Sequence, residues 1–541
     1  MVSAVLFITF FVLLVLNVPI SVCLGLSSAA AILYSGTSLT IVATNIYSGI
    51  SKFLLLAIPF FVLSGNIMAK AGISTRLIRF VDTCVGHRKG GIANVCIIVA
   101  CFFGAISGSG PATVAALGAV LIPAMVERGG FSAAFSTALM ATSSSIAIVI
   151  PPSIAFVVYA SITGVSIGDM FMAGIIPGIL MGLALVVVVM LEVRRNHVVP
   201  STVEKASAKE RWNAFKDAFW GFLMPVIILG GIYGGIFTPT EAAAVSVVYG
   251  LFVGMIIYKE VKFKDLWEIL IDSAKTTGGI MLIVACASLF SFVCTRFGIS
   301  TAASELLARV AGNQFTFLLI CNIIFLIAGC FIDANSAMYI FIPIMLPVCK
   351  ALGYNVIAFG IMATVNLAIG QVTPPVGVNL FVAIGIKLRD GIRVTLQEIS
   401  RAVVPMVAAS IVVLLIITYI PQISTCLPAA LGSAAAIENG ETAGGDSGTT
   451  QTDNDDFNTI GDYSDLDWAD MTWNFTCSTT ETSTWAQAGR KFGELMEQAT
   501  GGKVKVDVYA ADQLTGGNQS EGIQALMNGD PVQISMHSNL I

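Results

Sequence analysis

Charged residues are scarce in this chain of 541 residues, of which Asp, Glu, Lys and Arg make up only 11%. The first charged side chain is Lys52, so a long N-terminal stretch carries no charge. A soluble globular domain usually has about 25% charged residues. With a hydrophobic fraction of 56%, the composition excludes a soluble globular protein. The absence of a basic N-terminal segment also argues against a secretory signal peptide.

Residues that hold metals or carry out catalysis are few. The three histidines, His87, His197 and His537, form no metal-ligand spacing, and the eleven Cys contain no C-x-x-C pair, so we expect no zinc-type site. No Walker motif is present, which argues against an ATP-driven pump. No nucleophile–base set is recognisable either. We therefore predict that the chain is not an enzyme and uses no cofactor.

Apolar stretches long enough to cross a bilayer recur up to about residue 420. They predict an all-α polytopic membrane protein, with helices that include those at about residues 2–17, 19–35, 218–236, 241–258 and 402–420. The sequence Thr238-Pro239-Thr240-Glu241 fits a capping box with Pro at the first helical position. We therefore interpret Glu241 as a helix cap rather than a solute ligand.

The chain repeats itself at an offset of about 225 residues. "GAISGSGPATVAALGAVLIPAM" (Gly104–Met125) is echoed by "GCFIDANSAMYIFIPIMLPVC" (Gly329–Cys349), and "IPPSIAFVVYASI" (Ile150–Ile162) by "TPPVGVNLFVAIGI" (Thr373–Ile386). A shorter pair, "AGIST" and "FGIST", has the same offset. These pairs predict two repeats, at about residues 50–193 and 276–425.

Loop charges indicate that the two repeats have opposite orientations. The loop at 70–89 has five basic residues and its counterpart at 296–312 has two. At the next pair of loops the second repeat is the more basic one. The loop at 163–169 has no basic residue, and its counterpart at 387–401 has four. Since basic loops stay cytoplasmic, equivalent loops face opposite sides, which is the inverted topology of many secondary transporters. The basic linker at 194–217 is then cytoplasmic, and the N-terminus and C-terminal tail are outside.

Within the repeats, Gly, Pro and hydroxyl residues interrupt apolar runs and predict helical hairpins and broken helices. Irregular backbone at membrane depth is tolerated where it is buried in protein or lines a cavity. Freed carbonyl groups suit Na⁺, and freed amides at a half-helix N-terminus suit an anion. Two such breaks in inverted repeats are the best sequence indication of a transport site.

The polar residues at these breaks are the candidate ligands. Asp333 stands out because an ionisable residue in an apolar run indicates function, although Ser and Thr in membrane helices often bond only to a preceding carbonyl. The substrate-binding candidates are Ser107, Ser109, Thr113, Ser145, Ser153, Asn335, Thr373 and Asn379. The Na⁺ candidates are Ser107, Gly108, Ser144, Asp333, Ser336, Gln371, Thr373 and Gly377.

The C-terminal part differs from the rest in composition. Residues 426–470 are rich in Gly, Ser, Thr and acidic residues and are predicted to form a flexible acidic linker. Residues 471–541 then predict a partial α/β domain outside the membrane. Its expected elements are a strand at 471–477, a helix at 482–502, a strand at 503–510, a helix at about 517–528 and a strand in "PVQISMHS".

Residues 1–425 resemble the large membrane subunit of TRAP (tripartite ATP-independent periplasmic) transporters. The resemblance rests on the Gly104–Met125 motif, "GGIFTPTEAAAV" and "GQVTPPVGVNLFV". The tail, through "GGKVKVDVYAADQLTGGNQSEGIQALMNGDPVQIS", resembles the start of that family's periplasmic substrate-binding protein. The tail ends before the region where that family places its carboxylate-clamping Arg, and Arg490 is not assigned that role.

The resemblance implies an elevator-type, Na⁺-coupled importer of organic anions such as C4-dicarboxylates or sugar acids in the bacterial inner membrane. It places the hairpin tips at Ser107–Pro111 and Ile332–Ala337. Its implied partners are a separate small four-helix membrane subunit and a periplasmic binding protein, and nucleic acid is not among them. A stand-alone Na⁺/carboxylate symporter that needs no binding protein remains open. A membrane receptor is disfavoured, since the longest basic loop is too short for a signalling domain.

Overall fold

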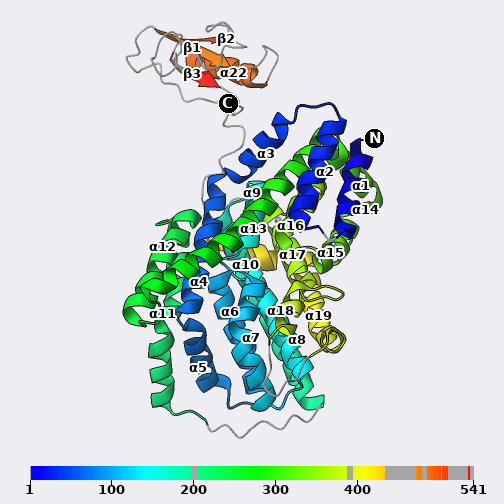
Figure 1. The fold of residues 1–541 in the computed structure, drawn as a ribbon. Helices are drawn as coiled ribbons and strands as arrows, with labels where there is room; N and C mark the ends of the chain where they lie inside the picture. Colours follow the sequence, from blue (N-terminus) through cyan, green and yellow to red (C-terminus); the bar gives the residue numbers. More distant parts are fainter. Residues whose placement is uncertain are drawn as a thin grey trace, which may run out of the picture. The chain divides into compact units, whose positions relative to one another are not determined.

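The computed structural model describes residues 2–16, 18–195, 205–386, 394–432, 471–477, 484–500, 503–509 and 534–536. The chain divides into two units, Met1–Glu441 and Thr442–Ile541. The described part of the first unit is entirely helical, and the second contains a small sheet with one helix (Figure 1).

Helices of the first unit follow one another in the order of the predicted repeats. Three helices come first: α1 (Val2–Val15), α2 (Ile20–Tyr34) and α3 (Thr40–Ile50). The next group is η1 (Phe53–Leu56), α4 (Ala57–Lys70), α5 (Ile73–Val85), α6 (Gly91–Ser107), α7 (Gly110–Glu127), α8 (Ala133–Ser145), η2 (Ile146–Ile148), α9 (Ile154–Thr163) and α10 (Ile167–Arg195).

The remaining helices repeat much of this order. The connecting helices are α11 (Ala208–Tyr233), α12 (Pro239–Leu251) and a π-helical segment, η3 (Phe252–Ile257). The last group is α13 (Phe263–Arg296), α14 (Ile299–Ala311), α15 (Gln314–Phe331), α16 (Ala334–Ala351), α17 (Val356–Gly370), α18 (Val378–Ile384), α19 (Leu396–Tyr419) and α20 (Gln422–Ala430).

Equivalent features mark the two halves. A left-handed glycine precedes both α5 and α14, namely Gly72 (φ 68°) and Gly298 (φ 68°). Each half then forms a helical hairpin, α6–α7 or α15–α16, followed by a segment broken at a Pro-Pro pair. In Figure 1, α5 lies toward the lower end of this unit and α14 toward the upper end, so the hairpins enter from opposite ends. The inverted repeat predicted from loop charge is thus present.

Nine helices in the described part of the chain are long and apolar enough to cross a bilayer. They are η1–α4, α7, α10, α11, α12–η3, α13, α15, α16 and α19. Several shorter apolar helices, including α6, α8, α9 and α17, belong to the hairpins and broken segments. This pattern confirms a polytopic all-α membrane fold with interrupted helices.

Capping boxes shift some helix starts from their predicted positions. At Glu241 the prediction is confirmed, because its carboxylate accepts from Thr238 N at 2.8 Å while Thr238 Oγ1 accepts from Glu241 N at 3.3 Å. Similar boxes start α11 after Ser207 and α19 after Thr395. The predicted starts at about 218 and 402 are therefore wrong, since these caps add polar first turns that hydropathy does not detect. Helix α20 was not predicted.

The second unit has a parallel sheet in the order β2-β1-β3. Its elements are β1 (Met471–Cys477), α22 (Thr484–Ala499), β2 (Val504–Tyr509) and β3 (Ile534–Met536). Met471 pairs with Val504, and Phe475 pairs with Ile534. The strands and first helix agree with prediction. The predicted helix at 517–528, the linker beyond residue 432 and the basic loop at 387–393 lie outside the described residues.

Small residues let the hairpins pack tightly within each half. A Cβ on Gly104 of α6 would lie 2.7 Å from Ala147 Cα, and one on Gly370 of α17 would lie 2.5 Å from the Gly329 backbone. Small residues are what allows helix backbones to approach so closely in a membrane. The two contacts are equivalent in the repeats and fix each hairpin against its broken segment.

We expect Gly370→Ala to lower the free energy of unfolding by about 1–3 kcal/mol, the usual cost of overpacking. The matched control is Gly278→Ala in the interior of α13, where an added Cβ would meet nothing within 4 Å and alanine is the better helix former. Thermal unfolding in detergent, followed by tryptophan fluorescence, measures both. Equal melting temperatures for the two variants would contradict the close-packing argument.

Candidate functional site

The tips of the two hairpins meet at one cavity of about 500 Å³. Gly108, Ser109, Gly110 and Pro111 line it from the first tip, and Asp333, Ala334 and Asn335 line it from the second. Other lining residues come from the broken segments (Ile148, Ile154, Ala155 and Gln371), from α2 (Ser21) and from α13 (Lys275, Thr276, Gly279, Ile280, Leu282 and Ile283). The helix breaks of the two inverted repeats therefore border the same cavity.

The first tip reverses the chain in two residues. Gly108 ends α6 with φ 60°, and a Cβ there would lie 2.7 Å from Pro152 O, so this position requires glycine. Ser109 begins α7 without a side-chain cap on the helix amides. Ser107 Oγ instead pairs with Thr113 Oγ1 at 2.8 Å. The first turn of α7 therefore has no side-chain cap, and because Pro111 lacks an N–H, its uncapped amides are those of Gly110 and Ala112.

The second tip is capped by its own carboxylate. Asp333 Oδ2 accepts from Asn335 N at 3.0 Å and from Ser336 N at 3.1 Å, and Ser336 Oγ donates to Oδ1 at 2.5 Å. An aspartate at this position satisfies helix amides and complements the helix dipole. Capping by itself therefore accounts for a carboxylate in this apolar run.

Three buried amide oxygens near the tips have no hydrogen-bond donor among the described residues: Gln371 Oε1, Asn379 Oδ1 and Asn335 Oδ1. The Gln371 and Asn379 side chains are 6% and 0% exposed. A Cβ built on Gly110 would lie 2.8 Å from both Gln371 Oε1 and Asn379 Nδ2, and 3.0 Å from Asn379 Oδ1. Unpaired buried acceptors are costly, so this arrangement suits an occupant that supplies positive charge.

The predicted residues divide into three groups by position. Of the candidates, Gly108, Ser109, Asp333, Asn335 and Gln371 line the cavity itself. Ser107, Thr113 and Asn379 lie directly behind the first tip, through the contacts given above.

The remaining hydroxyl candidates each donate a hydrogen bond to a carbonyl of their own segment. Ser144 Oγ donates to Met140 O, Ser145 Oγ to Thr142 O, Ser153 Oγ to Ile148 O and Thr373 Oγ1 to Ile369 O. Gly377 (φ 58°) starts α18 and donates its N–H to Cys330 O at 3.3 Å. These hydroxyls behave as Ser and Thr often do in membrane helices, where they bond only to a preceding backbone carbonyl. The assignment of individual ligands stays a prediction.

Lys275, Thr276 and Ser21 line the cavity but were not among the predicted residues. Lys275 falls at the end of a basic stretch, 259–275, that reads from sequence as a cytoplasmic segment. In the structure α13 begins at Phe263, which places Lys275 three turns inside a helix of 34 residues. The interior position of a lysine in that long helix is the signal that could have identified it.

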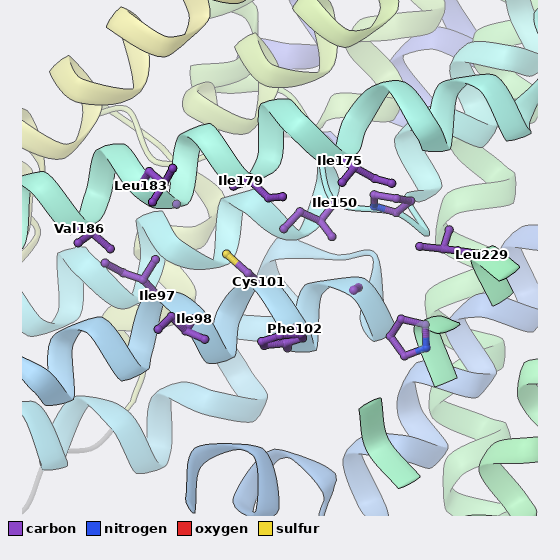
Figure 2. Close-up of a pocket in the computed structure, with 14 residues that line it drawn as sticks. Ile97, Ile98, Cys101, Phe102, Ile150, Ile175, Ile179, Leu183, Val186 and Leu229 are labelled. Carbon is purple, nitrogen blue, oxygen red and sulfur yellow. The ribbon is translucent and has the colours of Figure 1, made fainter. Parts of the chain in front are cut away.

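A second cavity, of about 400 Å³, has a different character. Figure 2 shows Ile97, Ile98, Cys101 and Phe102 from α6 facing side chains of α10, with Leu229 of α11 at one end. The α10 side chains are Ile175, Ile179, Leu183 and Val186. Because this lining is apolar, the space offers no group that could hold a carboxylate or a cation. Of these two cavities, the one between the hairpin tips is the candidate functional site, because the predicted residues of both repeats line it.

Inverted repeats whose broken helices meet at a cavity, with polar side chains at the hairpin tips, are the architecture of a membrane transport permease. Residues 7–423 match the family described as "Tripartite ATP-independent periplasmic transporter, DctM component". The chain therefore belongs to this family and is a TRAP large permease subunit rather than an enzyme. Residues 475–540 match "Bacterial extracellular solute-binding protein, family 7".

Known relatives cover most of the membrane region. The C4-dicarboxylate TRAP transporter large permease protein DctM of Rhodobacter capsulatus is 38% identical over 436 residues, which are 78% of this chain and 97% of the relative. The sialic acid TRAP transporter large permease protein SiaM of Vibrio cholerae is 35% identical over 400 residues, 74% of this chain and 92% of the relative. These identities agree with the resemblance to TRAP large subunits that the sequence motifs indicate.

A solved structure supports the fold. The Alcanivorax borkumensis YdaH transporter, whose crystal structure is described as having an unusual topology, matches with a TM-score of 0.52 at 15% identity. The match covers 70% of this chain and 88% of the YdaH chain. At this identity the likeness bears on the fold alone.

We expect Gly110→Ala to lower the initial rate of solute uptake about tenfold or more, because a displacement of about 1 Å can cost that much in a positioned site. The added methyl group would push against Gln371 and Asn379. Gly230→Ala in α11 is the matched control, since a Cβ there meets nothing within 4 Å. Uptake into proteoliposomes at equal protein content measures the effect, and a Gly110→Ala rate equal to wild type would refute it.

Proposed function

We propose that this subunit imports organic anions by Na⁺-coupled symport, with an elevator movement of the hairpins. The substrate class is that of C4-dicarboxylates, sugar acids or related carboxylates. Support comes from the family and from relatives whose names refer to C4-dicarboxylates and to sialic acid. The single observation that carries the proposal is the cavity shared by the two hairpin tips, which combines unpaired oxygens with uncapped amides.

The cation part of the proposal rests on oxygen chemistry. Na⁺ is a hard cation that favours oxygen ligands, as Ca²⁺ and Mg²⁺ do. Gln371 Oε1 and Asn379 Oδ1 converge on Gly110 without a donor, and the carbonyls that end α6 lie at the same tip. A bound cation would supply these oxygens with the positive partner they lack. The predicted ligands Gly108 and Asp333 line the same cavity, and Ser107 contacts Thr113 at the first tip.

The anion part rests on the start of α7. Its first amides have no side-chain cap, and a helix N-terminus favours negative groups. Ser109 and Asn335 line the cavity from the two tips and can donate to a carboxylate through a hydroxyl and an amide group. Substrate and Na⁺ would then bind side by side, and each would offset the charge of the other. That mutual stabilisation is the physical basis of coupling.

The proposed setting is the bacterial inner membrane, with the N-terminus and the C-terminal tail on the periplasmic side. The distribution of basic loops supports this orientation. The proposed partners are a small four-helix membrane subunit and a periplasmic substrate-binding protein. The family and the match of residues 475–540 to solute-binding proteins support them.

The test is uptake into proteoliposomes that contain this chain and a small TRAP subunit, with a complete binding protein added outside. Radiolabelled succinate and sialic acid are the probes, in Na⁺ or choline buffer. We expect uptake only with both Na⁺ and the binding protein. Equal uptake in choline would refute Na⁺ coupling. Equal uptake without the binding protein would instead favour a stand-alone Na⁺/carboxylate symporter.

Gln371→Met removes one unpaired oxygen at nearly constant volume. We expect the Na⁺ concentration for half-maximal uptake to rise about tenfold, equivalent to ~1.4 kcal/mol of Na⁺ affinity, with little change in melting temperature. The matched control is Gln314→Met at the exposed start of α15. A Na⁺ titration of the initial uptake rate measures the shift. Coinciding curves for both variants and wild type would remove Gln371 from the cation site.

A further inference from the structure

One wall of the cavity belongs to neither hairpin. Helix α13 contributes Lys275, Thr276, Gly279, Ile280, Leu282 and Ile283 to the lining. These positions recur at intervals of three and four residues, so they form one face of the helix. The hairpin tips supply other walls through Ser109 and Asn335. A solute between the tips therefore also faces α13.

Among the described residues that line the cavity, two side chains are charged, Lys275 and Asp333. The Asp333 carboxylate is engaged by two backbone amides and the Ser336 hydroxyl. Lys275 is paired only loosely, since its Nζ lies 3.7 Å from Asp272 Oδ1. Both of these side chains are well exposed, at 73% and 60%, and such pairs contribute little to stability. The ammonium of Lys275 can therefore turn toward an anion at small cost.

The chemistry of Lys275 complements that of the first tip. Its ammonium offers three donors and a positive charge, whereas the start of α7 offers the uncapped N–H groups of Gly110 and Ala112 on either side of Pro111. The two groups lie on different walls of one cavity. A solute with two carboxylates can satisfy both at once, and a solute with one carboxylate cannot.

We propose that Lys275 is a specificity-determining residue that binds one carboxylate of the transported anion while the tip of α6–α7 binds the other. This inference rests on the proposed function and narrows its substrate class to dicarboxylates. Charge-assisted hydrogen bonds to a carboxylate are about twice as strong as neutral ones. Loss of the ammonium therefore weakens binding of the dianion more than binding of a monoanion.

The test compares Lys275→Gln with Asp272→Asn in the reconstituted complex, with succinate, sialic acid and propionate as probes. We expect Lys275→Gln to raise the KM for succinate about tenfold or more, as for loss of a hydrogen bond to a charged group. We expect its half-saturating Na⁺ concentration and maximal uptake rate to stay within about twofold of the wild-type values. Lys275→Arg should restore most of the affinity for succinate. We expect Asp272→Asn to leave the KM unchanged or lower it, because it removes the competitor for Lys275.

Two controls separate this role from a structural one. Lys264→Gln makes the same charge change three turns earlier on α13, away from the cavity lining, and is expected to transport as wild type. If Lys275 served only to stabilise α13 through its ion pair with Asp272, the two variants Lys275→Gln and Asp272→Asn would show the same change in KM and the same change in melting temperature. That outcome overturns the proposal. An unchanged succinate KM in Lys275→Gln also overturns it.

The outcomes also distinguish this inference from the proposed function. Wild-type complex that takes up none of the three probes contradicts the proposed function, and the inference falls with it. Wild-type complex that takes up sialic acid but not succinate leaves anion import intact and overturns the dicarboxylate assignment. Succinate uptake with a raised KM in Lys275→Gln supports both.

Discussion

The requirement that every backbone amide and carbonyl at membrane depth find a partner controls this structure. A helix that stops inside the bilayer exposes such groups, and lipid cannot satisfy them. The protein stops two helices at one cavity, and only one of the two helix starts there has a side-chain cap. Asp333 caps the start of α16 with its own carboxylate, whereas α7 starts after Ser109 with no side-chain cap. Most of the chemistry at the cavity follows from that difference.

Close packing supports these unusual ends. Each hairpin tip contacts the broken segment of its own half, through Gly108 and Pro152 in the first and through Cys330 and Gly377 in the second. Across the halves, Asn379 donates to Ala141 O at 3.3 Å, which joins α18 to α8. The tips are therefore held by both repeats, so a cation or anion at the cavity would contact elements from the whole membrane unit.

Sequence reasoning predicted the architecture well because its signals are physical and local. The repeated motifs at one offset and the asymmetric loop charges identified the inverted halves, and the interrupted apolar runs together with the family resemblance located both tips. Helix starts were less predictable, since the polar first turns of α11 and α19 depend on capping boxes rather than on hydropathy. Lys275 was missed because a basic stretch gives no indication of where its helix begins. The unpaired oxygens of Gln371 and Asn379 depend on three-dimensional contacts that no linear pattern encodes.

The difference between the two hairpin tips affects the balance between inward-open and outward-open forms of the protein. If the two halves were identical, exchanging their roles would interconvert an inward-open and an outward-open form of the same free energy. The capped start of α16 and the uncapped start of α7 break that equivalence. Under the proposed elevator movement, the two forms of the empty protein would therefore have unequal free energies, and ligands bound in the cavity would add to that difference or oppose it.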